Sequence, residues 1–237
     1  MDAKKILFIA QEITPYLPES EIATICRNLP QGIQERGREI RTFMPKFGNI
    51  NERRNQLHEV IRLSGMNLII DDTDHPLIIK VASIQSARMQ VYFIDNEDFF
   101  QRKSTVSDEN GNEYEDNDDR SIFYVRGVLE TVKKLRWIPD VIHCHGWMSA
   151  LTALYIKRMY ADDPCLRNAK IVYSIYNDDF KNPLNKDFAT KLKADGAKEA
   201  DLKLVKADTS FLPYQSPETY MDEFNKFYDV VLDSNTK

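Results

Sequence analysis

Short runs of apolar, β-branched residues alternate along the chain with longer segments whose apolar positions recur at helical spacing. The runs at 5–10, 39–44, 90–94, 141–143 and 170–175 predict strands, and the segments 20–36, 120–135 and 148–160 predict helices. Such alternation is typical of an α/β fold with a doubly wound, Rossmann-like parallel sheet. We expect the 237 residues to form one domain.

Two stretches depart from this alternation. Residues 57–84 predict two or three short strands without an intervening helix, and therefore a small inserted β arm. Residues 177–216 are polar and predict a long surface segment, followed by a helix at 217–227 and a last strand at 229–232. Pro30 should kink or end the first helix near Leu29.

Charge and cysteine content narrow the class of protein. The net charge is −5 and no run of five basic residues occurs, which argues against a nucleic-acid or anionic membrane partner. Cys26, Cys144 and Cys165 are odd in number and unrelated in spacing, as reduced thiols would be. The first apolar run is too short for a signal peptide, so we expect a cytoplasmic protein.

The junction after the strand at 141–143 is the most informative position, because ligands of α/β sheets bind at the carboxyl ends of strands. His143 and His145 are two residues apart and should share one face, while Cys144 points the other way. No third ligand follows at helical spacing, so a metal site is disfavoured. We expect a buried, hydrogen-bonded His143, with His145 at the cleft rim donating to ligand hydroxyls, and a structural Cys144 in preference to a nucleophile.

A phosphate-binding loop is absent from the sequence. The chain has eight glycines, and none lies in a phosphate-loop pattern. The loop after the first strand contains Pro18, Glu19, Ser20 and Glu21. The carboxylates of Glu19 and Glu21 would repel a diphosphate at the helix terminus. We expect no cofactor.

The acidic segment 107–120 is predicted to be a solvated loop that leads into a helix, because its spacing does not fit a calcium loop. Aromatic residues near the strand ends could stack on a sugar ring or belong to the core. They are Tyr114, Tyr124, Trp147, Tyr176 and Phe180.

Three motifs in order, at 114–117, 141–151 and 174–177, make the chain resemble the amino-terminal domain of bacterial glycogen synthases and plant starch synthases. These are family 5 glycosyltransferases with a two-domain GT-B fold. The resemblance implies the amino-terminal half of that fold, and a retaining transfer of glucose from ADP-glucose or UDP-glucose to an α-1,4-glucan. It also implies a site near Asp116, Asn117, His145, Trp147, Tyr176 and Asn177, with His145 as the catalytic candidate beside the transferred sugar.

The sequence departs from the family pattern at several positions. The family's lysine- and glycine-containing donor loop falls on Pro18, Glu19, Ser20 and Glu21 and the residues after them, so only its helix scaffold is retained. Gly146 replaces the aspartate of the His-Asp-Trp motif and Tyr176 replaces the histidine of the Thr-Ile-His-Asn motif. The family's carboxy-terminal domain, which holds the nucleotide sugar, is not contained in these 237 residues.

This resemblance leaves three functions open. The leading hypothesis is a degenerate synthase-like domain that binds α-glucan or a glucan-metabolism enzyme and does not transfer sugar alone. The second is an active glucosyltransferase, a retaining hexosyltransferase completed by a separate carboxy-terminal-type chain or retaining weak activity. The third is a structural partner protein with an unoccupied cleft.

Overall fold

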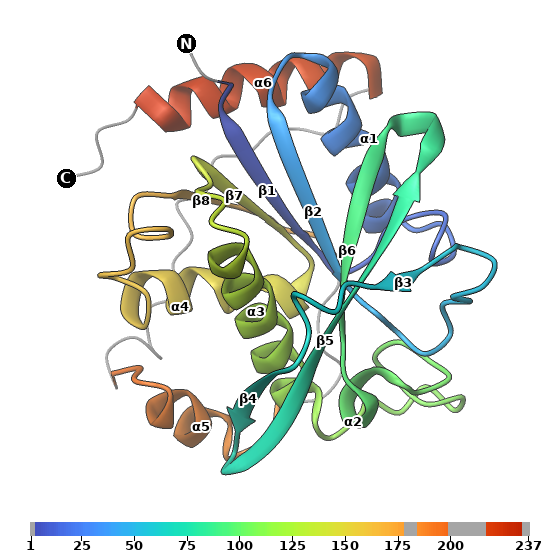
Figure 1. The fold of residues 1–237 in the computed structure, drawn as a ribbon, viewed down its shortest axis with the longest axis vertical. Coiled ribbons are helices and arrows are strands. Elements are labelled where there is room, and N and C mark those ends of the chain that lie inside the picture. The colour runs from blue at the N-terminus through green and yellow to red at the C-terminus, as the bar shows by residue number, and fades with distance from the viewer. Residues whose placement is uncertain (1–2, 178–183, 199–216, 234–237) are drawn as a thin grey trace.

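The computed structural model describes residues 3–177, 184–198 and 217–233. Its strands form one sheet in the order β3-β5-β6-β2-β1-β7-β8, and β4 pairs with β5 outside this path (Figure 1). The neighbours β6, β2, β1, β7 and β8 are all parallel, and β5 runs antiparallel to β6. The strands are β1 (Lys5–Ala10), β2 (Glu39–Pro45), β3 (His58–Glu59), β4 (Met66–Ile70), β5 (Thr73–Ile84), β6 (Met89–Asp95), β7 (Val141–His145) and β8 (Lys170–Ser174). The predicted doubly wound α/β fold is confirmed.

Helices cover both faces of the parallel strands. α1 (Glu21–Glu35) and α6 (Pro217–Asp233) lie side by side and pack with Ile6 and Phe8 on one face. α3 (Asn117–Lys134) and α4 (Thr152–Arg158) contribute to the larger core on the other face. The short helices are α2 (Glu97–Phe100) and α5 (Phe188–Ala194), and the 3-10 turns are η1 (Gln85–Ala87) and η2 (Trp147–Ser149).

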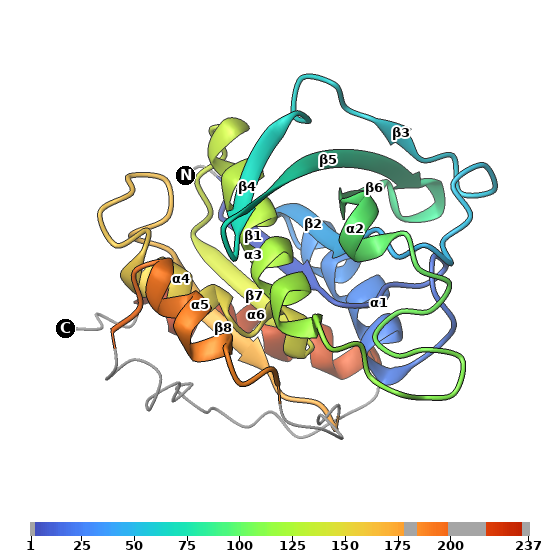
Figure 2. The same cartoon turned by 90° about the horizontal axis from the view of Figure 1, so that it is seen from below.

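The expected β arm is present, but one of its strands is long. β4 and β5 form a hairpin whose turn residues Asp71 and Asp72 both have positive φ, as a type I′ turn requires. β5 then continues along β6 from Ile78 to Ile84, so the arm grows out of the main sheet. Figure 2 shows β4 and β5 on the side of the molecule away from α6.

Three sequence predictions about helices were wrong in their limits. Pro30 is buried inside α1, so the alternative that it ends the helix near Leu29 is wrong, whereas the alternative of a kink stays a prediction. The segment predicted as one helix at 148–160 is the turn η2 followed by α4. A helix, α5, also lies inside the segment expected to be a plain surface stretch.

The predicted last strand at 229–232 is also wrong, because α6 runs through it to Asp233. The local run of β-branched residues is typical of a strand, but the apolar residues of the longer segment 217–233 recur at helical spacing, and this pattern decides the structure. Met221, Phe224 and Tyr228 recur at helical spacing and pack against the face that carries Ile6 and Phe8. Among the described helices, none is long and apolar enough to cross a membrane.

Candidate functional site

The two histidines of β7 lie together on one face of the sheet. Their ring centroids are 4.0 Å apart, and the ring of Phe8 on β1 lies 5.8 Å from His143 and 6.1 Å from His145. Both histidines are fully buried. The predicted shared face is confirmed.

His143 is a structural residue whose two ring nitrogens are both hydrogen-bonded. Nδ1 lies 2.6 Å from the Tyr228 hydroxyl of α6, and Nε2 lies 2.8 Å from Ser174 Oγ at the end of β8. Burial, with a further contribution from His145, lowers the pKa of His143 well below its usual value. The prediction of a buried, hydrogen-bonded His143 is confirmed.

His145 is buried, so its predicted place at the cleft rim was wrong. The rings of Phe8 and Tyr176 pack beside it, and its Nδ1 lies 2.7 Å from the Tyr176 hydroxyl. Burial lowers its pKa to about 3, so the imidazole is neutral at pH 7. Its Nε2 is buried and has no hydrogen-bond partner within the described residues, so this polar atom is unsatisfied in the structure.

The turn after His145 is locked to the end of β1. Gly146 has φ +82° and ψ 157°, and a Cβ at this position would lie 2.7 Å from Cβ of Gln11. The Gln11 side chain accepts a hydrogen bond from the backbone N–H of Met148 at 3.1 Å, and the backbone N–H of Gln11 donates to the His145 carbonyl. Sequence reasoning missed Gln11, although its place directly after the first strand was a signal. Trp147 is half-buried in this turn and packs against the core.

Cys144 points to the opposite face from the histidines, as predicted. Burial raises the pKa of its thiol to about 12, which outweighs hydrogen bonds with Thr152 and Ser149. A protonated thiol at neutral pH is a poor nucleophile. Cys144 therefore packs in the core.

The loop between β1 and α1 presents carboxylates to solvent. Pro18, Glu19 and Glu21 are exposed at the amino terminus of α1. Ser20 caps that helix: its Oγ accepts from the Ala23 N–H at 3.0 Å and donates to Glu12 at 2.6 Å. One of the free backbone N–H groups at the helix terminus is thus already hydrogen-bonded, and the terminus carries negative charge.

Asp116 and Asn117 at the start of α3 belong to an arginine network. Asp116 pairs with Arg102, and the fully buried Arg120 donates to the side chain of Asn117 at 2.7 Å. Arg120 also donates to the carbonyls of Phe99 and Thr105, and burial lowers its pKa to about 10. This network joins α2 and the acidic loop to α3, and sequence reasoning did not identify Arg120.

The remaining predicted site residues lie in different environments. Asn177 is exposed just after β8 and Tyr176. Tyr124 is a core residue whose hydroxyl donates to the carbonyls of Ala10 and Phe43, so it does not offer a stacking surface. Phe180 lies outside the described residues. Contacts within the described chain join Tyr176 to His145, whereas Asp116 and Asn117 contact a different set of residues.

Within residues 3–177, 184–198 and 217–233, no group of three or more histidine, cysteine or acidic side chains is arranged to hold a metal ion. The side chains of Gln11, His145 and Tyr176 at the ends of β1, β7 and β8 are neutral hydrogen-bonding groups. They suit hydroxyl recognition better than metal coordination.

A mostly parallel sheet, helices on both faces and a site at its carboxyl edge define the class: one half of a GT-B glycosyltransferase fold. The family model for the starch synthase catalytic domain matches residues 5–216. The chain therefore belongs to the starch synthase catalytic domain family.

Curated relatives are similar over the same region. Glycogen synthases of Pelodictyon phaeoclathratiforme and Chlorobaculum tepidum are each 38% identical over 174 residues, which is 73% of this chain and 36% of theirs. The matched region thus covers about a third of the length of these relatives. A solved structure, the catalytic domain of starch synthase IV from Arabidopsis thaliana bound to ADP and acarbose, has a TM-score of 0.62 at 22% identity. That alignment covers 72% of this chain and 33% of the plant chain, and supports the fold.

Proposed function

We propose that this starch synthase-like domain binds α-glucan at the carboxyl edge of its sheet and does not transfer glucose unaided. The observation that carries the proposal is the loop at the amino terminus of α1. Glu19 and Glu21 are exposed there, and Ser20 already caps the helix. Departure of a nucleoside diphosphate requires stabilisation of its negative charge, which these groups oppose.

Glucan recognition itself is supported by the buried end of β7. The neutral His145 holds one ring nitrogen without a partner in the described chain, and Tyr176 fixes the orientation of that ring. A hydroxyl of a sugar can exchange a hydrogen bond with this nitrogen in either tautomer. As further contacts to the glucan we propose Trp147, Asn177, Asp116 and Asn117. We also propose that the protein is cytoplasmic and that a glucan-metabolism enzyme is its partner.

Two assays on the purified chain test the two halves of the proposal. Native electrophoresis through glycogen should retard the chain, and Asn177→Ala should reduce the retardation, whereas Asn67→Ala should not. Both asparagines are exposed, but Asn67 lies on the β arm. Labelled ADP-glucose and UDP-glucose should give no incorporation into glycogen above that of His145→Ala.

The outcomes separate the candidate functions. Unretarded migration in glycogen would refute glucan binding and favour a partner protein. Transfer that disappears in His145→Ala would refute the degenerate-domain hypothesis and favour the second candidate, an active retaining glucosyltransferase. His145 is the observation that favours this candidate, and transfer only after addition of a separate carboxy-terminal-type domain would show that such a domain completes the site.

A further inference from the structure

A groove lies at the opposite edge of the sheet, beside the amino ends of β2 and β6. It has a volume of about 800 Å³, and its walls come from the end of α1, the starts of β2 and β6, and the segment that joins β5 to β6. β2 runs for seven residues from this edge to the carboxyl edge, a length of about 20 Å. The groove is therefore separate from the His145 site, and a role for it is independent of the proposed function.

The groove is basic in a chain whose net charge is −5. Arg38, Arg41 and Arg88 line it, together with Glu39 as the one acidic lining residue. Arg38 is already neutralised, because it pairs with Asp229 of α6 at 2.8 Å. Glu39 accepts a hydrogen bond from the Trp137 indole. Arg41 and Arg88 have no carboxylate partner within the described part of the chain.

Arg41 is held by one hydrogen bond and two aromatic rings, and its Nε lacks a hydrogen-bond partner within the described chain. Its Nη1 donates to the hydroxyl of Tyr92, and its central carbon lies 5.6 Å from the Tyr92 ring centroid and 5.4 Å from that of Trp137. Its Nε is buried and has no hydrogen-bond partner among the described residues. The Nε and Nη2 donors form the fork that binds a carboxylate or phosphate through two parallel hydrogen bonds.

A second polar atom in the groove also lacks a partner. The side-chain Oε1 of Gln34 is buried and receives no hydrogen bond from the described residues. Amide and hydroxyl side chains complete the polar lining, and they suit a ligand with several hydroxyl groups. They are Ser83, Gln85 and Gln90.

From these contacts we propose that the groove binds a small polyhydroxylated molecule that carries an oxyanion, either a phosphate or a carboxylate. The oxyanion takes the Nε of Arg41, which is unpartnered in the described chain, and the Nη2 beside it, with Arg88 at the exposed side of the groove. The hydroxyl groups take Gln34 and the amide lining. Neither a neutral polyol nor a bare anion fulfils both requirements.

Titration calorimetry with 6-phosphogluconate, gluconate, inorganic phosphate and glucitol tests this assignment. Gluconate carries only the carboxylate, so binding of 6-phosphogluconate without binding of gluconate would assign the phosphate, and equal binding of the two would assign the carboxylate. 6-Phosphogluconate or gluconate should bind saturably, inorganic phosphate should bind more weakly, and glucitol should not bind. Arg41→Lys should weaken binding about tenfold, because lysine cannot form the two parallel hydrogen bonds. The binding should also weaken with added salt.

Arg88→Asn provides a second variant that leaves the core intact. Arg88 is exposed and has φ +50°, a conformation that asparagine tolerates. We expect about threefold weaker binding, whereas Arg54→Asn, at another exposed arginine, should bind as the parent does. Thermal melts check that each variant is folded. The inference is overturned if no oxyanion binds saturably up to about 10 mM, if glucitol or inorganic phosphate binds as tightly as the best ligand, or if neither Arg41→Lys nor Arg88→Asn weakens binding.

Discussion

At the turn after β7, Gly146 holds a backbone conformation that is essentially restricted to glycine. Its φ of +82° and ψ of 157° lie where a Cβ is strained. A Cβ would also meet Gln11 at its own Cβ, the least mobile atom of that side chain. Gly146 is thus part of the fold of this turn, and a residue with a Cβ at this position would require the backbone or Gln11 to move.

Gly146→Ala should therefore destabilise the protein by about 2–4 kcal/mol, the sum of backbone strain and overlap with Gln11. Gly65→Ala is the matched control. Gly65 has φ +85° and nothing lies within 4 Å of its Cβ position. Gly65→Ala therefore introduces backbone strain without overlap and should lower the unfolding free energy by about 1–2 kcal/mol. Urea unfolding measures both changes. Equal losses in the two variants would mean that Gln11 moves aside freely and that the turn is not tightly packed against β1.

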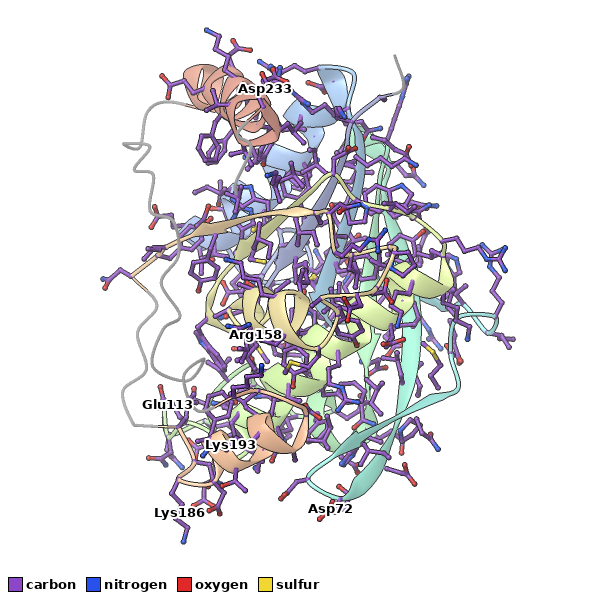
Figure 3. The ribbon with its side chains drawn as sticks, turned by 90° about the vertical axis from the view of Figure 1, so that its left-hand side faces the viewer. Asp72, Glu113, Arg158, Lys186, Lys193 and Asp233 are labelled. Atoms are coloured by element: carbon purple, nitrogen blue, oxygen red, sulfur yellow. The ribbon has the colours of Figure 1, made fainter. Side chains whose placement is uncertain are left out.

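At the scale of elements, α5 is held to α3 by buried charge. Lys191 lies 3.0 Å from Asp118 and 2.8 Å from Asp119, both in the first turn of α3, while Asp195 beyond the end of α5 pairs with Arg126. Figure 3 shows Lys186 and Lys193 of this segment at the end of the molecule opposite Asp233 of α6. Burial opposes the charge of Lys191, but hydrogen bonds to Asp119 and Asp118 outweigh it and raise its pKa.

Lys191→Met should cost about 3–5 kcal/mol of unfolding free energy, because it leaves the buried carboxylate of Asp118 without its cation. The exposed Lys186→Met, just before the same helix, should change stability by less than about 0.5 kcal/mol. Chemical denaturation gives the totals, and hydrogen exchange at residues 188–194 shows whether α5 is released. If Lys191→Met lowered the unfolding free energy no more than Lys186→Met does, Lys191 would not hold α5.

These elements also show what the sequence could and could not predict. The parallel strands and the His143 environment follow from local patterns, since buried strands and two-residue alternation are short-range signals. α5 was missed because its anchor is an ion pair between residues far apart in the sequence. The end of α6 was assigned to a strand because its local residues have strand propensity. It is helical because packing against α1 and β1 outweighs that propensity. The burial of His145 depends on rings from β1 and the end of β8, which a motif alone does not locate.

At the scale of the whole molecule, the sheet brings two neutral histidines into the core, and this should make stability depend on pH. Burial lowers the pKa of both His143 and His145, the latter to about 3. The unfolded chain binds protons at these positions below a pKa of about 6.5, whereas the folded protein does not. Their contribution is therefore complete above about pH 6.5 and is lost progressively as the pH falls toward the folded values.

Between pH 7 and pH 5.5, where few carboxylates titrate, the pair should reduce the unfolding free energy by about 2 kcal/mol. His145→Gln should remove about half of this pH dependence, because glutamine does not titrate. His58→Gln, at a ring that is exposed in the folded protein, should leave it unchanged. Urea unfolding at the two pH values, compared as differences within each variant, separates this effect from any loss of packing. If His145→Gln retained the full parental pH dependence, His145 would have to be protonated in the folded protein. The hydrogen bond to Tyr176 would then have to be reassigned with a charged ring.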